Sequence, residues 1–466
     1  MSDPAVKGLS VHPALPITIL ATSLGFVVVQ LDGSILNVAL PQIGISLGTS
    51  VDGLQWTVDA YFLAFAVLLL SAGVLSDRLG ARQAFVSGFG VFSAASLACA
   101  LAPNPAALII ARAVQGGGAA LLVPCSLALL NHACGNDAGV RARAIGIWTA
   151  AGAVGSAAGP VLGGLLVGFV GWRSIFLVNL PIGLIGIWLT LRFIDQTTIR
   201  SQLRRGPDLA GQTLAIFALV GLVGAIIEAG SLGWRAPLVL SSVVLAVLAG
   251  TGFIIVEAKT RAPAVPLELF RYSAFSTATI VGFAVNLTVY GSIFAFALYF
   301  QHVMLFSPVE TGLAFLPFAL AMTMANFIGG RIAASFGLRL PIIGGLLVGA
   351  TGCVLLSEID RQTTYAAMLP GQLLIRGGIG LVVPPMTAAV LSTVDRTRSG
   401  IASGLLNAAR QTGGAVGVAA FGALMATDMV QGVQIALVGC AGLLVVAALI
   451  AVAGIRSEST SVPTCR

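Results

Sequence analysis

The sequence predicts an all-α polytopic membrane protein with 14 transmembrane helices. The composition, the number of long apolar runs and the distribution of basic residues support this fold class. Of 466 residues, 57% are hydrophobic and 9% are charged, with a mean hydropathy of +1.00. Soluble domains carry about 25% charged residues. The composition therefore excludes a water-soluble fold, and the net charge of +7 does not indicate a nucleic-acid partner.

The 14 helices correspond to apolar runs of about 20 residues or more, the length that crosses a bilayer. The first run begins at Ile17 and has no small-residue cleavage site, so it is interpreted as a spanning helix and not as a cleaved signal. The predicted spans are 17–40, 54–75, 82–102, 105–131, 143–168, 173–194, 209–230, 237–257, 274–303, 309–334, 338–357, 366–392, 399–425 and 432–455.

The basic residues predict the orientation of these spans. With the N-terminus in the cytoplasm, 18 of the 24 Lys and Arg residues fall in cytoplasmic segments. The external loops contain Arg173, Arg235 and Arg361, and the helices contain Arg112, Arg376 and Arg410. Because cytoplasmic loops carry an excess of Lys and Arg, this distribution supports an even number of spans with both termini in the cytoplasm.

An internal repeat divides the chain into two similar parts. The turn Gly73–Arg82 recurs as Gly330–Arg339, and its two glycines and final arginine match at one offset. The offset exceeds the length of six spans by enough for two more helices. The predicted organisation is a cytoplasmic segment 1–16, a six-helix half 17–194, a basic loop with two inserted helices 195–258, a second six-helix half 259–456 and a cytoplasmic tail 457–466. Parallel halves of this kind occur in secondary transporters.

Three ionisable residues of the first half share a depth in the predicted membrane. Asp32, Asp59 and Arg112 each lie roughly 7–12 Å from the outer end of their helix, at 1.5 Å per residue. Intramembrane charges face a bundle interior or a water-filled cavity. This set predicts either a proton-coupling and cation-binding cluster or a structural ion pair, and Asp59 is alternatively an interfacial residue.

The second half has a different set of buried charges. Arg376 and Arg410 have no acidic partner within its predicted helices, so they bind either backbone carbonyls or an anionic group of a substrate. No histidine or cysteine has metal-ligand spacing, no nucleophile–base pair is evident and no phosphate-binding loop is present. We therefore expect no metal, no cofactor and no enzymatic activity, and an ion gradient as the energy source.

Five motifs in chain order resemble the major facilitator superfamily, specifically its fourteen-helix drug:proton antiporter branch. Gly73–Arg82 resembles the superfamily's loop between helices two and three, and Leu31–Pro41 resembles the helix-one motif of the branch. Arg112–Gly118 is similar to the helix-four arginine motif. Gly155–Gly164 is similar to the antiporter motif of helix five, and Gln55–Tyr61 to helix two of quaternary-ammonium exporters.

The resemblance implies roles for individual residues. Proton coupling is expected of Asp32 and Arg112. The substrate-binding residues expected from it are Asp32, Asp59, Tyr61 and Gln115. A cytoplasmic latch between the halves is expected of Gly73, Asp77, Arg78, Gly80 and Arg82. The antiporter-motif helix is expected to use Gly155, Gly159, Pro160 and Gly163, whose spacing also permits ordinary close helix packing.

The chain departs from the branch in its second half, where carboxylates are almost absent away from helix ends. This departure favours monovalent cations, zwitterions or neutral lipophiles over divalent cations. The resulting hypothesis is a monomeric, proton-coupled multidrug exporter of a bacterial cytoplasmic membrane, whose partners are protons, membrane lipid and small lipophilic or cationic compounds. The alternatives are a dedicated exporter of a self-made metabolite or antibiotic, and a membrane sensor with a transporter fold.

Overall fold

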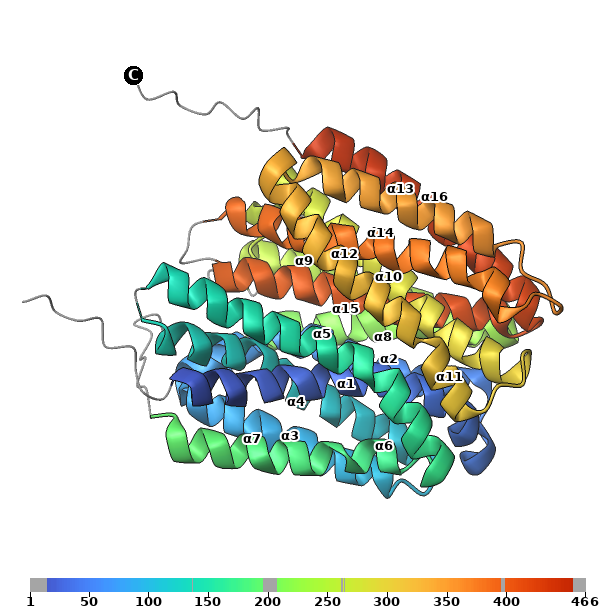
Figure 1. Cartoon of the computed structure of the whole chain (residues 1–466), viewed down its shortest axis with the longest axis horizontal. Helices are drawn as coiled ribbons and strands as arrows, with labels where there is room; N and C mark the ends of the chain where they lie inside the picture. The colour runs from blue at the N-terminus through green and yellow to red at the C-terminus, as the bar shows by residue number, and fades with distance from the viewer. Residues whose placement is uncertain are drawn as a thin grey trace, which may run out of the picture.

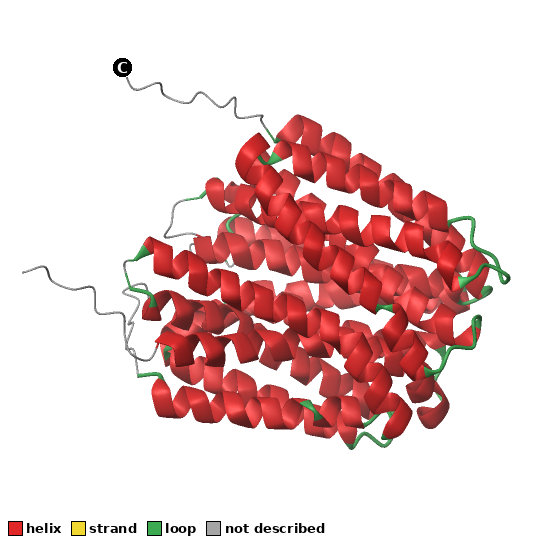
Figure 2. Cartoon of the chain, in the orientation of Figure 1, coloured by secondary structure: helices red, strands yellow, loops and turns green. Residues whose placement is uncertain are grey.

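A computed structural model describes residues 15–135, 137–195, 208–260, 263, 265–394 and 399–455. Long helices run side by side along one direction and are joined by loops, and the described residues contain no strand (Figures 1 and 2). The predicted tails and most of the basic loop 195–208 lie outside the described residues.

The first part of the chain forms one side of the bundle, drawn from blue to green in Figure 1. Its helices are α1 (Leu15–Leu47), α2 (Val51–Leu79), α3 (Ala81–Ala100), α4 (Pro105–Ala133), α5 (Ala138–Phe169), α6 (Ser174–Leu177) and α7 (Asn179–Phe193).

The last part forms the other side, drawn from yellow to red. Its elements are the 3-10 helix η1 (Leu267–Arg271), α10 (Ser273–His302), α11 (Pro308–Ala314), α12 (Leu316–Phe336), α13 (Arg339–Leu356), α14 (Tyr365–Ser392), α15 (Ser399–Met425) and α16 (Met429–Gly454).

The helix pairings of the first part recur in the last part. Helix α1 packs against α5, and α4 packs against α2 and α3; in the same way α10 packs against α15, and α14 packs against α12 and α13. Contacts of α7 with α1 and α3 likewise recur as contacts of α16 with α10 and α13. The two sides meet where α2 packs against α15 and where α5 packs against α11 and α12.

The helices α8 (Leu209–Leu232) and α9 (Pro237–Lys259) pack against each other beside this bundle. Helix α8 also contacts α2 and α15, so it covers one seam between the two sides. Its glycines make these contacts close. A methyl group added at Gly230 would approach the Ala423 Cα of α15 to 2.6 Å, and Gly224 faces the Trp56 ring of α2.

Twelve helices in the described part of the chain are long and apolar enough to cross a membrane. Two further helices would complete the predicted 14. They are α2 with 29 residues and α15 with 27, each about 40 Å long. The side chains of residues 70, 74 and 77 in α2 lie outside the described structure, and Asn407, Arg410 and Gln411 lower the hydropathy of α15. The count of 14 therefore stays a prediction.

Two spans predicted as uninterrupted helices are broken in the structure. The span 173–194 divides at Val178 into α6 and α7, and the span 309–334 divides at Phe315 into α11 and α12. Pro181 and Pro317 stand in the first turns of α7 and α12. Proline lacks an amide hydrogen and its ring clashes with the carbonyl four residues earlier, which explains why each helix restarts there.

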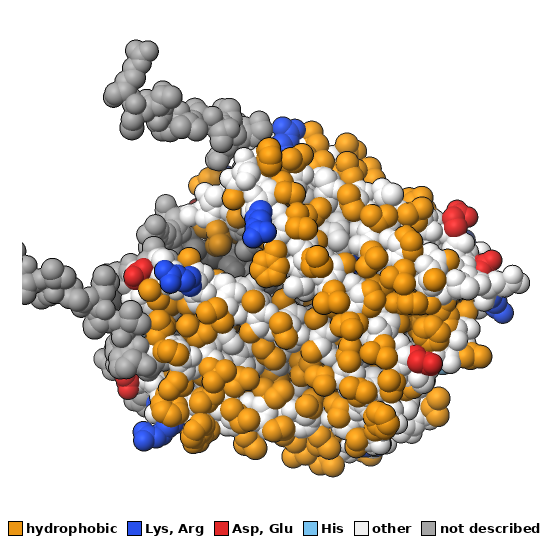
Figure 3. Space-filling view, in the orientation of Figure 1, with side chains coloured by type: hydrophobic (Ala, Val, Ile, Leu, Met, Phe, Trp, Pro, Cys, Tyr) orange, Lys and Arg blue, Asp and Glu red, His pale blue; other side chains and the backbone are white. Residues whose placement is uncertain are grey.

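The surface agrees with a membrane location. Figure 3 shows hydrophobic side chains covering the flank of the bundle, while most of the visible charged side chains lie toward its two ends. The Trp188 and Trp234 side chains are 59% and 64% exposed, respectively. A flank of this composition is stable against lipid chains and unstable against water.

The two copies of the repeated turn have the same backbone geometry. Gly80 has φ 84° and ψ 141°, and Gly337 has φ 82° and ψ 169°, a region that only glycine occupies readily. The arginine that follows binds the end of a neighbouring helix in each copy. Arg82 Nη2 donates to the Leu191 carbonyl of α7 at 2.7 Å, and Arg339 Nη2 donates to the Val452 carbonyl of α16 at 2.8 Å.

Candidate functional site

The centre of the candidate site is an ion pair between α1 and α4. Arg112 Nη1 lies 2.5 Å from Asp32 Oδ2, and the two side chains are 1% and 0% exposed. A buried pair of this kind is retained only when its remaining donors and acceptors are bonded. The structure thus places the two residues predicted for proton coupling in direct contact, although contact alone does not establish that role.

The second oxygen of Asp32 accepts two amide hydrogen bonds. Gln115 Nε2 donates to Asp32 Oδ1 at 2.8 Å, and Asn179 Nδ2 of α7 donates to the same oxygen at 2.9 Å. Both amides also donate to Ser96 Oγ of α3, at 2.6 and 3.2 Å. Three helices therefore meet at one carboxylate, α3 joins them through Ser96, and both carboxylate oxygens are bonded.

Arg112 has other partners besides Asp32. Its Nη1 donates to Gln115 Oε1 at 2.6 Å, and its Nε donates to the Thr57 carbonyl of α2 at 3.3 Å. Its guanidinium lies 4.3 Å from the centroid of the Tyr61 ring, within the range of a cation–π contact. Two of the predicted substrate-binding residues, Gln115 and Tyr61, are consequently held against Arg112.

Asp59 does not join this cluster. It is fully buried, and neither of its carboxyl oxygens has a hydrogen-bond partner within the described residues. One turn earlier on the same helix, Gln55 Nε2 donates across the seam to the Ala419 carbonyl of α15 at 2.7 Å. Residues four apart share a helix face, so Asp59 lies on the side of α2 that meets α15. An ionised carboxylate without partners is very costly to bury, so the environment of Asp59 differs from that of Asp32, whose carboxylate is paired.

The glycine motif of α5 contacts the segment that carries Asp32. A methyl group at Gly159 would overlap the Ser34 hydroxyl, and one at Gly163 would approach the Ile35 carbonyl to 2.8 Å. Gly155 faces Val27 in the same way. The motif therefore packs α5 tightly on α1, as its spacing predicts. The Pro160 carbonyl points the other way, toward Gly312 of α11.

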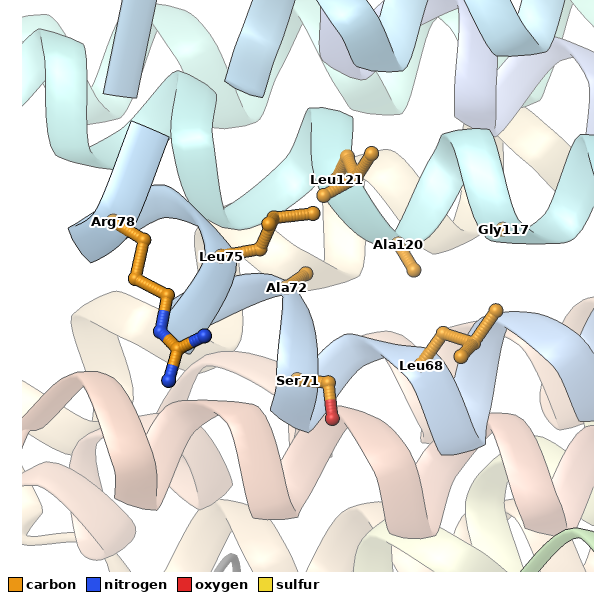
Figure 4. A pocket seen from close by; sticks show the side chains of 8 residues that line it. All are labelled: Leu68, Ser71, Ala72, Leu75, Arg78, Gly117, Ala120 and Leu121. Atoms are coloured by element: carbon orange, nitrogen blue, oxygen red, sulfur yellow. The ribbon is translucent and has the colours of Figure 1, made fainter. Parts of the chain in front are cut away.

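The predicted latch adjoins a pocket at the C-terminal end of α2. The pocket has a volume of about 240 Å³ and is lined by Leu68, Ser71, Ala72, Leu75, Arg78, Gly117, Ala120 and Leu121. Figure 4 shows Ser71 and Arg78 pointing to the same side, with leucines of α2 and α4 above and beside them. The side chain of Asp77 lies outside the described part of the structure. Arg82, also assigned to the latch, binds α7 within its own side of the bundle.

Two polar residues of the cluster escaped the sequence analysis, Asn179 and Ser96. Asn179 stands where α6 gives way to α7, in the turn that contains Pro181. An amide inside an apolar run next to a proline was the available signal. Ser96 has no such signal, because serine is common in membrane helices, where it often bonds to its own backbone.

The intramembrane arginines of the other side have neutral partners. Arg376 Nη2 of α14 donates to Ser292 Oγ at 3.1 Å and to the Val289 carbonyl at 3.4 Å. Arg410 Nε of α15 donates to Asn286 Oδ1 of α10 at 3.2 Å. Both arginines therefore bind neutral acceptors of the protein, and binding of an anionic substrate group stays a prediction.

A bundle of membrane-crossing helices with twofold-related pairings and a buried polar cluster defines a multi-pass membrane transporter. A family model described as "Major Facilitator Superfamily" matches residues 22–418. The chain belongs to this superfamily.

Several relatives are similar over most of the chain. The "Methylenomycin A resistance protein" of Streptomyces coelicolor is 40% identical over 422 residues, which cover 91% of this chain and 88% of that protein. The "Multidrug resistance protein Stp" of Mycobacterium tuberculosis is 38% identical, with 88% and 76% covered. The "Tetracenomycin C resistance and export protein" of Streptomyces glaucescens is 34% identical, again with 88% and 76% covered.

Solved structures show the same fold at low identity. The crystal structure of a mutant of the nucleoside transporter NupG has a TM-score of 0.66 at 12% identity and covers 94% of this chain and 100% of that chain. A bacterial homologue of the human lysosomal transporter Spinster also has a TM-score of 0.66, at 17% identity, and covers 95% and 97%. These likenesses support the transporter fold.

Proposed function

We propose that the protein is a proton-coupled exporter of small amphipathic or cationic compounds that works by alternating access. The observation that carries the proposal is the Asp32 carboxylate, buried among α1, α3, α4 and α7 and bonded to Arg112. The names of the relatives, which refer to drug and antibiotic resistance, support export.

The partners of Asp32 and Arg112 would allow their ion pair to separate when a proton arrives. A proton on Asp32 removes the ionic attraction to Arg112, while the Gln115 and Asn179 amides still have an acceptor in the carboxyl oxygen. Arg112 already has Gln115 Oε1 and the Thr57 carbonyl as further acceptors, so it can leave the pair without losing all its hydrogen bonds. When Arg112 leaves Asp32, α1 and α4 lose the ion pair that joins them, and the two helices can move relative to each other. Binding of the proton is thereby coupled to helix movement.

The proposed orientation places the N-terminal end of α2 outside the cell. At that end the two sides are joined by the Gln55 bond to α15, and Gln301 Nε2 of α10 donates to the Val38 carbonyl of α1 at 3.0 Å. The Gly312–Pro160 contact lies there too. This arrangement supports an outward-closed state. In the outward-open state these contacts separate, and the Gly73–Arg82 turn closes the cytoplasmic end.

We further propose the complete topology as 14 spans, with α2 and α15 included and α8 and α9 inserted between two six-helix halves. The boundaries are those predicted, 17–194 and 259–456, with both termini in the cytoplasm of a bacterial cell. Their support is the recurrence of helix pairings and of the Gly80 and Gly337 geometry.

Asp59 is proposed to attract the cationic part of a substrate when the seam between α2 and α15 opens. Its carboxyl group is neutral while buried and can ionise when water reaches it. A cation arriving at that moment compensates the new charge. Trp56, three residues before Asp59 on α2, would supply aromatic surface, whereas Tyr61 stays against Arg112.

A dedicated exporter of a self-made compound is the second candidate. The observation that favours it is the naming of relatives after single antibiotics, methylenomycin A and tetracenomycin C. The mechanism would be the same, with a narrower range of substrates.

Efflux assays test the proposed function. The chain is expressed in an efflux-deficient bacterium, and accumulation of a panel of dyes and antibiotics is measured with and without a protonophore. We expect reduced accumulation that the protonophore abolishes, and loss of efflux in Asp32→Asn. The matched control is Asp52→Asn, at the first turn of α2 and away from the cluster. Normal efflux in Asp32→Asn would refute its coupling role, and export of one compound only would favour the dedicated exporter.

A further inference from the structure

The C-terminal side of the bundle buries positive charge without a negative partner. Arg376 is 3% exposed and lies about 16 Å from the N-terminal end of α14; Arg410 lies equally far along α15. The acidic residues described between Ser273 and Ile455 all stand in loops or at helix ends: Glu310, Glu358, Asp360 and Asp428. None of them can neutralise these two guanidinium groups.

The partners that the two arginines do have are neutral. Arg376 bonds to Ser292 and to the Val289 carbonyl, and Arg410 bonds to the Asn286 amide oxygen. A guanidinium has five N–H donors arranged in a fork, and these contacts use a minority of them. The bonds hold both side chains toward α10 but leave the charge uncompensated.

The internal repeat shows which residue of the C-terminal side stands where the N-terminal side has its buried carboxylate. At the offset of 257 that aligns the two turns, Gln115 corresponds to Gln372, and Asp32 corresponds to Val289. Gln372 is fully buried, and neither atom of its amide has a hydrogen-bond partner in the described structure. It lies one turn before Arg376 on α14, so the two side chains share a face. Only the amide is kept at its aligned position, since Leu369 stands where Arg112 would fall and Arg376 falls on Ala119. This side of the bundle thus places an amide and a guanidinium on one face of α14, in another order, and has no carboxylate between them.

The arginines adjoin the seam between the two sides. Arg376 bonds to Val289 and Ser292, which stand on either side of Tyr290 in α10. Gly414, one turn after Arg410 on α15, faces the Tyr290 ring. The Tyr290 ring lies 4.6 Å from the ring of Phe62 on α2, across the seam. Arg410 and Tyr290 are partly exposed although they lie deep within their helices. Charged groups at such depth face the bundle interior or a water-filled cavity and not lipid, so both residues lie on the inner side of their helices.

We propose that Arg376, Arg410 and Tyr290, with Gln372 behind them, form a subsite for a carboxylate group of the transported compound. The substrate carboxylate would pair with these arginines as Asp32 pairs with Arg112. Arginine forks bind carboxylates through paired hydrogen bonds, and Phe62 and Tyr290 offer a flat apolar surface to the rest of the molecule. This inference rests on the proposed export function and narrows its substrates to amphipathic acids and zwitterions.

Paired probes test the subsite in the purified full-length chain. Binding of 2-naphthoic acid and 9-anthracenecarboxylic acid is compared with binding of their methyl esters, by quenching of tryptophan fluorescence in detergent. We expect each acid to bind at least about tenfold more tightly than its ester, the worth of one charge-assisted hydrogen bond. Arg376→Gln should abolish that preference, Arg410→Gln should reduce it, and Arg376→Lys should keep part of it, because lysine retains charge but not the fork.

The matched control is Arg361→Gln, which removes a 76% exposed arginine from an outer loop and should leave the preference unchanged. An equal affinity for acids and esters would overturn the proposal, and so would a preference that survives Arg376→Gln and Arg410→Gln. The thermal midpoint is measured for every variant. A merely structural Arg376 would lower it strongly on substitution by Gln, which would also overturn the proposal, whereas a binding arginine should leave it unchanged or raise it.

The dye-efflux assay separates this inference from the function on which it rests. Protonophore-sensitive efflux together with equal affinity for acids and esters would refute only the proposed carboxylate subsite. Preferential binding of acids without any efflux would refute the proposed export function. The subsite would then belong to a carboxylate-binding membrane protein.

Discussion

The two sides of the bundle share helix pairings but treat buried charge in opposite ways. On the N-terminal side, Arg112 faces Asp32, so the positive charge is compensated within the chain. On the C-terminal side, Arg376 faces a serine and a carbonyl. A fold made from one unit used twice thus holds a self-contained ion pair on one side and an open cationic site on the other. On the proposals made above, the ion pair exchanges a proton and the uncompensated arginines receive a negative charge from the substrate.

The two copies of the repeated turn likewise share their backbone geometry but differ in charge. Gly80 and Gly337 have the same positive φ, and Arg82 and Arg339 both bind the last carbonyls of a neighbouring helix. These shared features hold the turn in shape. Asp77 and Arg78 have no counterpart in the second copy, where Ala334 and Ser335 stand. The residues that differ are therefore the candidates for a role beyond structure.

The two sides should differ most in how much stability the protein loses when Arg112 or Arg376 is replaced. Arg112→Gln leaves Asp32 buried and unpaired, which should lower the free energy of unfolding by about 3–5 kcal/mol. Arg376→Gln removes an uncompensated cation and should change it by less than about 1 kcal/mol, or raise it, because no buried partner is left behind. Unfolding in mixed micelles with increasing SDS measures both.

A double variant sharpens this prediction. Asp32→Asn combined with Arg112→Gln removes both charges, so it should recover much of the stability that Arg112→Gln loses. Equal losses for Arg112→Gln and Arg376→Gln would contradict the distinction between a closed pair and an open site.

The helix contacts of the two sides should be equally tight, because glycine allows the backbones to approach closely on each side. A methyl group at Gly378 of α14 would lie 2.5 Å from the Gly345 carbonyl oxygen of α13, and one at Gly116 of α4 would overlap the Tyr61 carbonyl of α2. Overpacking of this kind costs about 1–3 kcal/mol. Gly378→Ala and Gly116→Ala should each lower the thermal midpoint.

The neighbouring Gly377 is the control, because a methyl group there would meet no atom within 4 Å. Gly377→Ala should be neutral or slightly stabilising, since alanine favours helix. A loss at Gly377 equal to that at Gly378 would show that helix propensity, and not close approach, decides the outcome.

A smaller effect is expected at the glycines of the two turns. Alanine at Gly80 or Gly337 must adopt a positive φ, which costs about 1–3 kcal/mol and is partly offset because alanine has less freedom than glycine in the unfolded chain. The two losses should agree within about 0.5 kcal/mol, measured by the same SDS titration. A much larger loss at Gly80 would show that the turns differ in structure as well as in charge.

The sequence predicts the bundle, the repeat and the depth of Asp32 and Arg112, because length, apolarity and offset are properties of a single chain. It does not predict which charges meet. Asp59 and Tyr61 are two residues apart, so they point to sides of α2 about 200° apart. Tyr61 faces Arg112, and Asp59 faces away from it. A helix that is apolar all round gives little sign of its rotation, so depth alone placed Asp59 with Arg112.

Pro181 and Pro317 could have predicted the helix breaks at Val178 and Phe315. The breaks were not predicted because both prolines lie within long apolar runs. The position of Asn179 depends on the first break, because the restart of α7 directs its amide to Asp32. The repeat shows that Val289 replaces the carboxylate of Asp32 on this side, but the meaning of that replacement became clear only after Gln115 was seen bonded to Asp32. Pairing between distant helices supplied that information.

The smallest effect is expected where the two sides are most alike, at the arginines that end each turn. Arg82→Ala and Arg339→Ala each remove hydrogen bonds to carbonyls at a partly exposed helix end. Such bonds contribute about 0.5–1.5 kcal/mol, and exposure to water places these two near the lower limit. Both variants should therefore unfold within a few degrees of the wild type. If the Gly73–Arg82 turn alone is a latch, Arg82→Ala should also slow dye efflux while Arg339→Ala does not. Equal slowing by both variants would mean that the second turn takes part in closing the cytoplasmic end, despite its missing charges.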